Sequence, residues 1–251
     1  MMILSEVTGG AGIIRLNRPE KRNALSPALI SEFRSALRDF RLDESVRVII
    51  ITGMGTSFCA GADLSYLMKL RENSITENEQ DSFDISQFFV DVYETDKPVI
   101  AAVNGPAIAG GCGLATACDF IFADRRNARF GYSEVRIGFV PAIVSFLLLK
   151  RVGEVKARQM LLSAEIMDAE QALTAGIADR LSDDPLNDAL EFAGKLIKNS
   201  GTAMAAVKRM LRDISIDDYK AAVSKLVNVN VLSRTTEDFK NGLKNFLEKD
   251  R

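Results

Sequence analysis

Short apolar runs alternate with segments of helical periodicity in the first half of the chain. The runs typical of strands cover residues 3–7, 11–16, 46–52, 99–103 and 120–123. Helical spacing extends from Pro27 to Leu42, with Ser26 as a suitable N-cap. Because strands separated by helical stretches form βα units, the pattern predicts an α/β fold with parallel pairing.

The pattern changes after Pro141, where helical periodicity dominates and no strand pattern of comparable quality follows. The predicted helices cover residues 154–163, 169–175, 185–198, 203–211, 217–232 and 236–248. The apolar stripes of the last helices must pack on another surface. We therefore predict a core of residues 1–199 that holds the functional site and a helical module of residues 200–251.

Composition excludes several classes of protein. The chain has 251 residues, 47% of them hydrophobic, and a net charge of −2 without a basic cluster, so no nucleic-acid partner is expected. The longest apolar run, residues 137–149, is too short to cross a bilayer and contains Pro141. The N-terminus lacks the charged start and apolar length of a secretory signal. These features predict a soluble, cytoplasmic protein with no membrane partner.

Histidine is absent from the chain, which limits the chemistry available to it. Ser-His-Asp and Cys-His nucleophile systems are excluded, so acid–base work falls to Glu, Asp, Lys, Tyr or a water held by the backbone. The three cysteines, Cys59, Cys112 and Cys118, have no metal-type spacing. We expect them to be small buried hydrophobic residues, and we expect no metal site.

Two glycine-containing turns follow predicted strands, at residues 57–64 and 104–114. Small residues allow the backbone to approach a ligand closely, and the start of a helix directs free amide groups outward. Two such amides aimed at one point would form an oxyanion hole. The alternative is tight packing between strand and helix that tolerates only small side chains. Neither turn matches a phosphate-binding loop.

The motifs in these two turns resemble the oxyanion-hole segments of the crotonase (enoyl-CoA hydratase/isomerase) superfamily. They read Phe-Cys-Ala-Gly-Ala-Asp-Leu at 58–64 and Asn-Gly-Pro-Ala-Ile-Ala-Gly-Gly-Cys-Gly-Leu at 104–114. Further matches at residues 16–25, 130–138, 169–176 and 239–249 extend the resemblance over nearly the whole chain. The resemblance implies a spiral of ββα units with a C-terminal helical module that forms homotrimers or homohexamers.

The resemblance also implies the catalytic groups. The backbone amides of Ala62 and Gly110 correspond to the pair that holds a thioester oxygen as an enolate forms. Glu134 matches the catalytic glutamate of the family, although an isolated carboxylate is more often an ordinary surface residue. Asp63 is interpreted as a helix cap and not as a base.

Coenzyme A enters as part of an acyl-CoA substrate, so no separate cofactor is expected. The resemblance implies that the coenzyme contacts Lys21, Arg22, Ala24, Ala60, Phe246 and Lys249. Simple solvation of a polar loop is the alternative for Lys21 and Arg22.

The chain departs from the two-glutamate pattern at Gly113, where many hydratases of the family have their second acid. Reversible hydration of a 2-enoyl-CoA by Glu134 is our interpretation, because residues 133–145 resemble bacterial hydratases of the methylglutaconyl-CoA type. Hydration is expected if Gly113 leaves room for a water positioned by Glu134 and backbone groups. If that space is dry, a Δ3-Δ2-enoyl-CoA isomerase that uses Glu134 alone is the alternative. A catalytically idle CoA-binding homologue is a third hypothesis.

Overall fold

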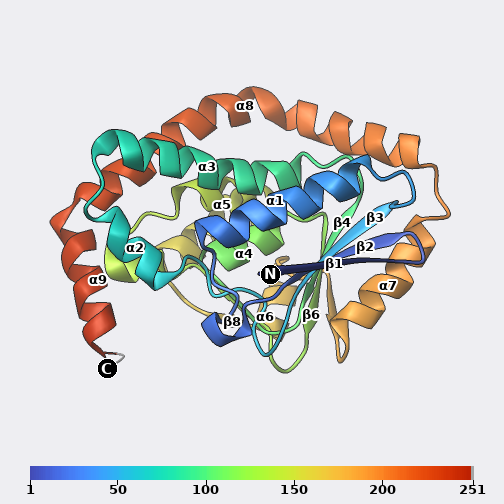
Figure 1. Ribbon diagram of the computed structural model, residues 1–251, viewed down its shortest axis with the longest axis horizontal. Helices are drawn as coiled ribbons and strands as arrows, with labels where there is room; N and C mark the ends of the chain where they lie inside the picture. The colour runs from blue at the N-terminus through green and yellow to red at the C-terminus, as the bar shows by residue number, and fades with distance from the viewer. Residues whose placement is uncertain (250–251) are drawn as a thin grey trace.

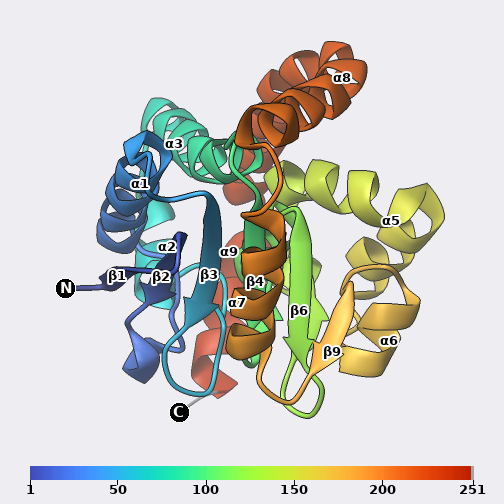
Figure 2. The same cartoon turned by 90° about the vertical axis from the view of Figure 1, so that its right-hand side faces the viewer.

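A twisted sheet of six strands forms the centre of the computed structural model, which describes residues 1–249 and their side chains except at 213–225, 238, 243, 246, 247 and 249. The strand order is β1-β2-β3-β4-β6-β9, as Figure 2 shows from left to right. The strands are β1 (Ile3–Thr8), β2 (Ala11–Leu16), β3 (Val48–Gly53), β4 (Val99–Val103), β6 (Phe120–Asp124) and β9 (Arg180–Ser182).

Pairing within this sheet follows the predicted pattern. β1 and β2 form an antiparallel hairpin, and β2, β3, β4, β6 and β9 pair in parallel. β3 and β4 are buried along their whole length, which explains their continuous apolar sequence. The predicted parallel α/β arrangement is confirmed.

Helices cover both faces of the sheet. α7 (Pro185–Leu196) packs on one face through Ala189 and Ala193 against Ile50 and Ile100. The other face carries the larger core beneath α1 (Pro27–Leu42), α3 (Ile75–Tyr93) and α4 (Gly110–Thr116). The remaining short helices in the first half are η1 (Pro19–Lys21) and α2 (Leu64–Leu70).

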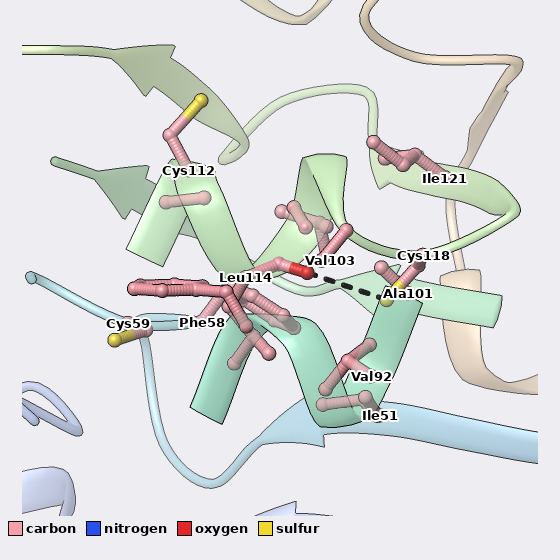
Figure 3. Packing of buried hydrophobic residues seen from close by; sticks show 14 of the residues in the cluster. Ile51, Phe58, Cys59, Val92, Ala101, Val103, Cys112, Leu114, Cys118 and Ile121 are labelled. Atoms are coloured by element: carbon pink, nitrogen blue, oxygen red, sulfur yellow. Dashed lines mark hydrogen bonds between the residues drawn. The ribbon is translucent and has the colours of Figure 1, made fainter. Parts of the chain in front are cut away.

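The three cysteines belong to the larger core, as predicted. All three are buried, and Figure 3 shows them among apolar side chains such as Phe58 and Val103. Burial raises the pKa of the Cys59 and Cys112 thiols to about 12. Because thiolates are then scarce at neutral pH, these cysteines are packing residues and not nucleophiles.

A second, smaller sheet has three strands. Its order is β5-β7-β8, with β5 (Pro106–Ile108), β7 (Arg129–Gly131) and β8 (Met167–Asp168). β5 leads directly into α4, and β7 leads to the short 3-10 helix η2 (Glu134–Ile137). Since β5 and β7 pair in parallel, the start of α4 and the start of η2 lie at the same edge.

The C-terminal half differs from the sequence prediction in two respects. Two short strands that were not predicted, β8 with two residues and β9 with three, follow Pro141. The two helices predicted at 203–211 and 217–232 are one helix, α8 (Gly201–Thr235). The other helices are α5 (Ala142–Ser163), which is kinked at Gly153, α6 (Ala169–Thr174) and α9 (Glu237–Lys249).

α8 crosses the top of the molecule along α3, and α9 turns back at its far end (Figure 1). α8 packs on α3 and α5, whereas α9 packs on η2. α8 and α9, which fall within the predicted helical module of residues 200–251, therefore pack on the core of the same chain. Among the described residues, no helix is both long and apolar enough to cross a membrane.

Candidate active site

A cavity of about 350 Å³ lies where α2, α4, η2, α5 and α8 meet. Its wall is mainly apolar, with side chains such as Leu67, Phe89 and Ile143. Ala62, Gly110 and Glu134, the three predicted catalytic positions, all line it. An enclosed apolar space with a few convergent polar groups is the usual form of a small-molecule site.

A larger hollow of about 760 Å³ lies over α1 and α3. Its wall carries exposed charged side chains, including Arg38 and Arg41, and none of the three predicted catalytic positions. The smaller cavity is the better candidate for chemistry because it contains a buried carboxyl group.

The first candidate amide, at Ala62, is held by a short parallel bridge to Leu25. The Leu25 amide donates to the Gly61 carbonyl at 2.7 Å, and the Asp63 amide donates to the Leu25 carbonyl at 2.8 Å. These bonds fix both neighbours of Ala62. The Ala62 amide itself forms no hydrogen bond within the described part of the chain.

Asp63 caps the helix that follows. One carboxylate oxygen accepts from the amides of Ser65 at 2.8 Å and Tyr66 at 3.3 Å, and the other pairs with Arg18 at 2.8 Å. Burial favours a higher pKa for Asp63, but the hydrogen bonds from Ser65 and Arg18 outweigh it and lower the pKa. The prediction that Asp63 caps this helix is confirmed.

The second candidate amide, at Gly110, is the first of α4. Ala109 before it has a φ of 52°, an uncommon conformation for a residue with a Cβ. The Ala109 amide donates to the Gly131 carbonyl of β7 at 2.8 Å, which holds this turn in place. The Gly110 amide has no acceptor among the described residues, as expected at a helix start.

The two turns approach each other closely. A Cβ on Gly61 would lie 2.9 Å from both the Ala109 Cβ and the Ile108 carbonyl oxygen, and Gly61 has a φ of +87°. A second bridge joins Cys59 to Ala107. The free amides of Ala62 and Gly110 are therefore held on adjoining turns at one wall of the cavity, where they can serve as paired donors to an oxyanion.

Glu134 begins η2 and is only 9% exposed. One of its carboxylate oxygens is buried without a hydrogen-bond partner among the described residues. Burial raises the pKa of Glu134 to about 7, because the ionised form is poorly solvated. A carboxyl group with this pKa can both accept and return a proton near neutral pH.

The space beside Gly113 is not open. A Cβ on Gly113 would overlap Cγ1 of Val144 and would lie 3.2 Å from Cε1 of Phe89. Of the two possibilities left open by the sequence, the structure shows the filled one: an apolar side chain of α5 occupies the place. Any water used in a reaction must lie in the cavity beside Glu134.

Gly113→Ala should lower the free energy of unfolding by about 1–3 kcal/mol, since a methyl group would be forced into Val144. Adding Val144→Ala should recover part of this loss. Chemical denaturation of the single and double variants measures both effects. Gly194→Ala on α7 is the control, because its Cβ would meet no atom within 4 Å. A Gly113→Ala variant as stable as the wild type would contradict the packing described here.

The residues predicted to bind coenzyme A are only partly brought together. Ala60 lines the cavity, and its amide donates to the Arg22 carbonyl at 3.0 Å. Lys21 and Arg22 are exposed on the loop around η1, and Ala24 is buried behind them. The side chains of the other two predicted positions, Phe246 and Lys249 on α9, lie outside the described part of the structure.

Sequence reasoning missed two polar residues on the cavity wall, Asn230 and Arg234 of α8. Both are buried, with exposures of 3% each. Their spacing of one helical turn within an otherwise apolar stripe was the available signal. It could not show which surface the stripe covers.

Known proteins match this chain over almost its whole length. The family model described as enoyl-CoA hydratase/isomerase matches residues 6–251. The 2,3-dehydroadipyl-CoA hydratase of Escherichia coli K12 is 36% identical over 94% of this chain and 92% of its own. The crotonyl-CoA hydratase of Syntrophomonas wolfei is 33% identical over 98% and 95%. A crystal structure of an enoyl-CoA hydratase/isomerase from Xanthobacter autotrophicus superposes with a TM-score of 0.90 at 28% identity, covering 99% of this chain and 97% of that one.

Proposed function

The chain belongs to the enoyl-CoA hydratase/isomerase family, and we propose that within it the protein adds water reversibly to a 2-enoyl-CoA thioester. The observation that carries this proposal is the position of Glu134. Its buried carboxyl group, one oxygen of which has no hydrogen-bond partner among the described residues, shares one cavity with the two free amides of Ala62 and Gly110. The two relatives compared above are both named as hydratases of CoA thioesters, which supports the same reaction type.

The proposed reaction needs one carboxyl group. Ionised Glu134 accepts a proton from a water in the cavity while the water oxygen bonds to C3 of the thioester. The C2–C3 double-bond electrons move toward the carbonyl, and the amides of Ala62 and Gly110 stabilise the resulting enolate oxygen. The glutamic acid then returns its proton to C2. The product is a 3-hydroxyacyl thioester, and the carboxylate is regenerated.

A direct assay tests this proposal. Purified protein incubated with linear and branched 2-enoyl-CoA thioesters should abolish the absorbance of the conjugated thioester and yield the 3-hydroxyacyl product. An unchanged absorbance with every substrate of the panel would contradict hydration and would favour an idle CoA-binding homologue. Glu134 argues against the idle homologue, because burying a carboxyl group with one unsatisfied oxygen destabilises the fold and a catalytic role would explain why it is there.

Isomerisation of a 3-enoyl-CoA is the second candidate, and Val144 favours it. The side chain fills the space where a second acid would stand, so that wall of the cavity is apolar. Glu134 alone could then move a proton between the α and γ carbons, with the same two amides holding the oxygen. The isomerase would act on 3-enoyl thioesters without any gain of water.

The rate of hydration should depend on pH through Glu134. The carboxyl must be ionised to accept a proton from water, and its pKa of about 7 leaves it protonated in acid. We expect kcat/KM to fall about tenfold per pH unit below pH ~7 and to level off above it. A pH–rate profile that is flat from pH ~5.5 upward would show an ordinary carboxyl and contradict the raised pKa.

Assembly and coenzyme contacts stay predictions. Exposed apolar side chains on α8, such as Val207, Met210 and Leu211, are compatible with the expected homotrimer or homohexamer. We propose that Lys21, Arg22, Ala24 and Ala60 form the coenzyme edge, together with Phe246 and Lys249. Light scattering that gives the mass of a single chain would contradict the proposed assembly.

A further inference from the structure

Arg234 is a buried cation on the wall of the candidate active-site cavity. It lies near the C-terminal end of α8, and only 1% of its side chain is exposed. The mechanism proposed above does not use it. Because burying a charged group is costly, its presence beside an apolar cavity requires a physical reason.

The guanidinium group is only partly hydrogen-bonded. Nη1 donates to Asp81 Oδ2 at 2.6 Å and to Asn78 Oδ1 at 3.3 Å. Nε is buried without a partner, and Nη2 forms no hydrogen bond within the described part of the chain. Nε and Nη2 together form the edge with which arginine binds a carboxylate through two parallel hydrogen bonds.

Neighbouring side chains hold this edge in place. Asp81 and Asn78 fix Nη1 from α3, and the Phe139 ring lies 5.6 Å from the guanidinium carbon. Asn230, one turn earlier on α8, accepts from Ser82 at 2.7 Å. The free edge is therefore preorganised, which lowers the cost of binding a ligand there.

The charges around the cavity favour an anion. Arg234 lines the cavity, whereas its partner Asp81 lines the outer hollow over α1 and α3. Arg136 also lines the cavity and forms no ion pair within the described residues. Glu134, with its raised pKa, is the one acidic side chain of the described cavity wall.

We propose that the Nε–Nη2 edge of Arg234 binds a carboxylate carried by the acyl chain beyond the double bond, so that the substrate is the CoA monothioester of an unsaturated dicarboxylic acid. The inference rests on the proposed function for the reaction itself. It specifies, in addition, which class of acyl group the substrate carries. A neutral chain would leave the buried Nε of Arg234 without an acceptor, whereas a carboxylate satisfies both Nε and Nη2.

The test compares 2-enoyl-CoA thioesters in matched pairs of equal chain length, from five to eight carbons. One member ends in a carboxylate and the other in its methyl ester. We expect the wild-type protein to hydrate the carboxylate with a kcat/KM about 10- to 100-fold higher than the ester for at least one length. This ratio is the usual contribution of hydrogen bonds to a charged group. Equal efficiencies at every length, or a preference for the esters, would overturn the proposal.

Arg234→Lys keeps a cation opposite Asp81 but removes the two-donor edge. The variant should lose most of the preference for the carboxylate, measured as the ratio of kcat/KM between the two members of each pair. Arg212→Lys is the matched control, since Arg212 is on the same helix, is 11% exposed and pairs with Asp96 at 2.8 Å. Its preference should be unchanged. A similar loss in both variants, or an Arg234→Lys variant that keeps the full preference, would contradict the role of Arg234.

Binding of the saturated thioesters separates this inference from the proposed reaction. Calorimetry with the wild-type protein should show tighter binding of the carboxylate than of its ester, whether or not any enoyl substrate is hydrated. If no substrate is hydrated but this difference in affinity is present, the proposed function fails and the carboxylate site stands. If the esters are hydrated and the difference is absent, the reaction stands and the carboxylate site fails. This measurement does not depend on the folding of any variant.

Discussion

Glu134→Gln is expected to lower kcat/KM for hydration by about 10²- to 10⁴-fold, the usual contribution of a positioned acid–base group. The amide keeps the volume of the side chain but cannot accept a proton from water. Binding of a saturated acyl-CoA should change little, because the cavity wall stays intact. Steady-state kinetics and calorimetry measure the two effects separately. Glu191→Gln, an exposed position on α7, is the control.

The same variant should also be more stable than the wild type at pH ~8. The pKa of Glu134 is about 7 in the folded protein against an ordinary value of 4.5, so the folded state holds its proton more tightly than the unfolded state. The resulting penalty is absent below pH ~4.5, grows up to pH ~7 and is complete above it. It is on the order of 3 kcal/mol. Activity near wild type together with unchanged stability would remove Glu134 from the account.

Gly61→Ala should lower kcat/KM by about 10²- to 10³-fold, comparable to the loss of one oxyanion donor. The new Cβ would press on Ala109 and on the Ile108 carbonyl, and would move the Ala62 and Gly110 amides apart. Kinetics on a 2-enoyl-CoA, with unfolding measured in parallel, tests this expectation.

Gly176→Ala is the matched control for that substitution. Gly176 has a φ of +79°, close to that of Gly61, but a Cβ there would meet no atom within 4 Å. The control variant should therefore be destabilised by the conformational strain of a non-glycine residue with a positive φ, but it should keep its activity. Equal losses of activity in both variants would show that strain alone, and not the separation of the two amides, causes the effect.

Local sequence patterns predicted the centre of the fold well. The buried strands β3 and β4 and the helix α1 have strong periodicity or continuous apolar sequence, so local sequence is sufficient to place them. β9 was missed because it has only three residues, too few for a period to be recognised. α8 was predicted as two helices because polar residues interrupt its apolar stripe. Arg212 at that interruption pairs with Asp96, so a tertiary contact supports the helix there.

The candidate site could be predicted only in part. The motifs around Ala62, Gly110 and Glu134 indicated positions that the structure brings onto one cavity, although their catalytic roles stay predictions. Val144 and Arg234 could not be found in the same way. Val144 meets Gly113 through packing between α4 and α5, and Arg234 reaches the cavity because α8 folds back across α3. Contacts between distant segments leave no periodic signal in the sequence.

The fate of water tests the central claim most directly. Purified protein is incubated in ¹⁸O-labelled water, in separate reactions, with a 2-enoyl-CoA and with the 3-enoyl-CoA of equal length, and the products are analysed by tandem mass spectrometry. The account predicts that the 2-enoyl thioester gains one labelled water, with the label on C3, and that Glu134→Gln abolishes this gain. Rapid conversion of the 3-enoyl thioester to its 2-enoyl isomer, with no label incorporated from either substrate, would contradict hydration.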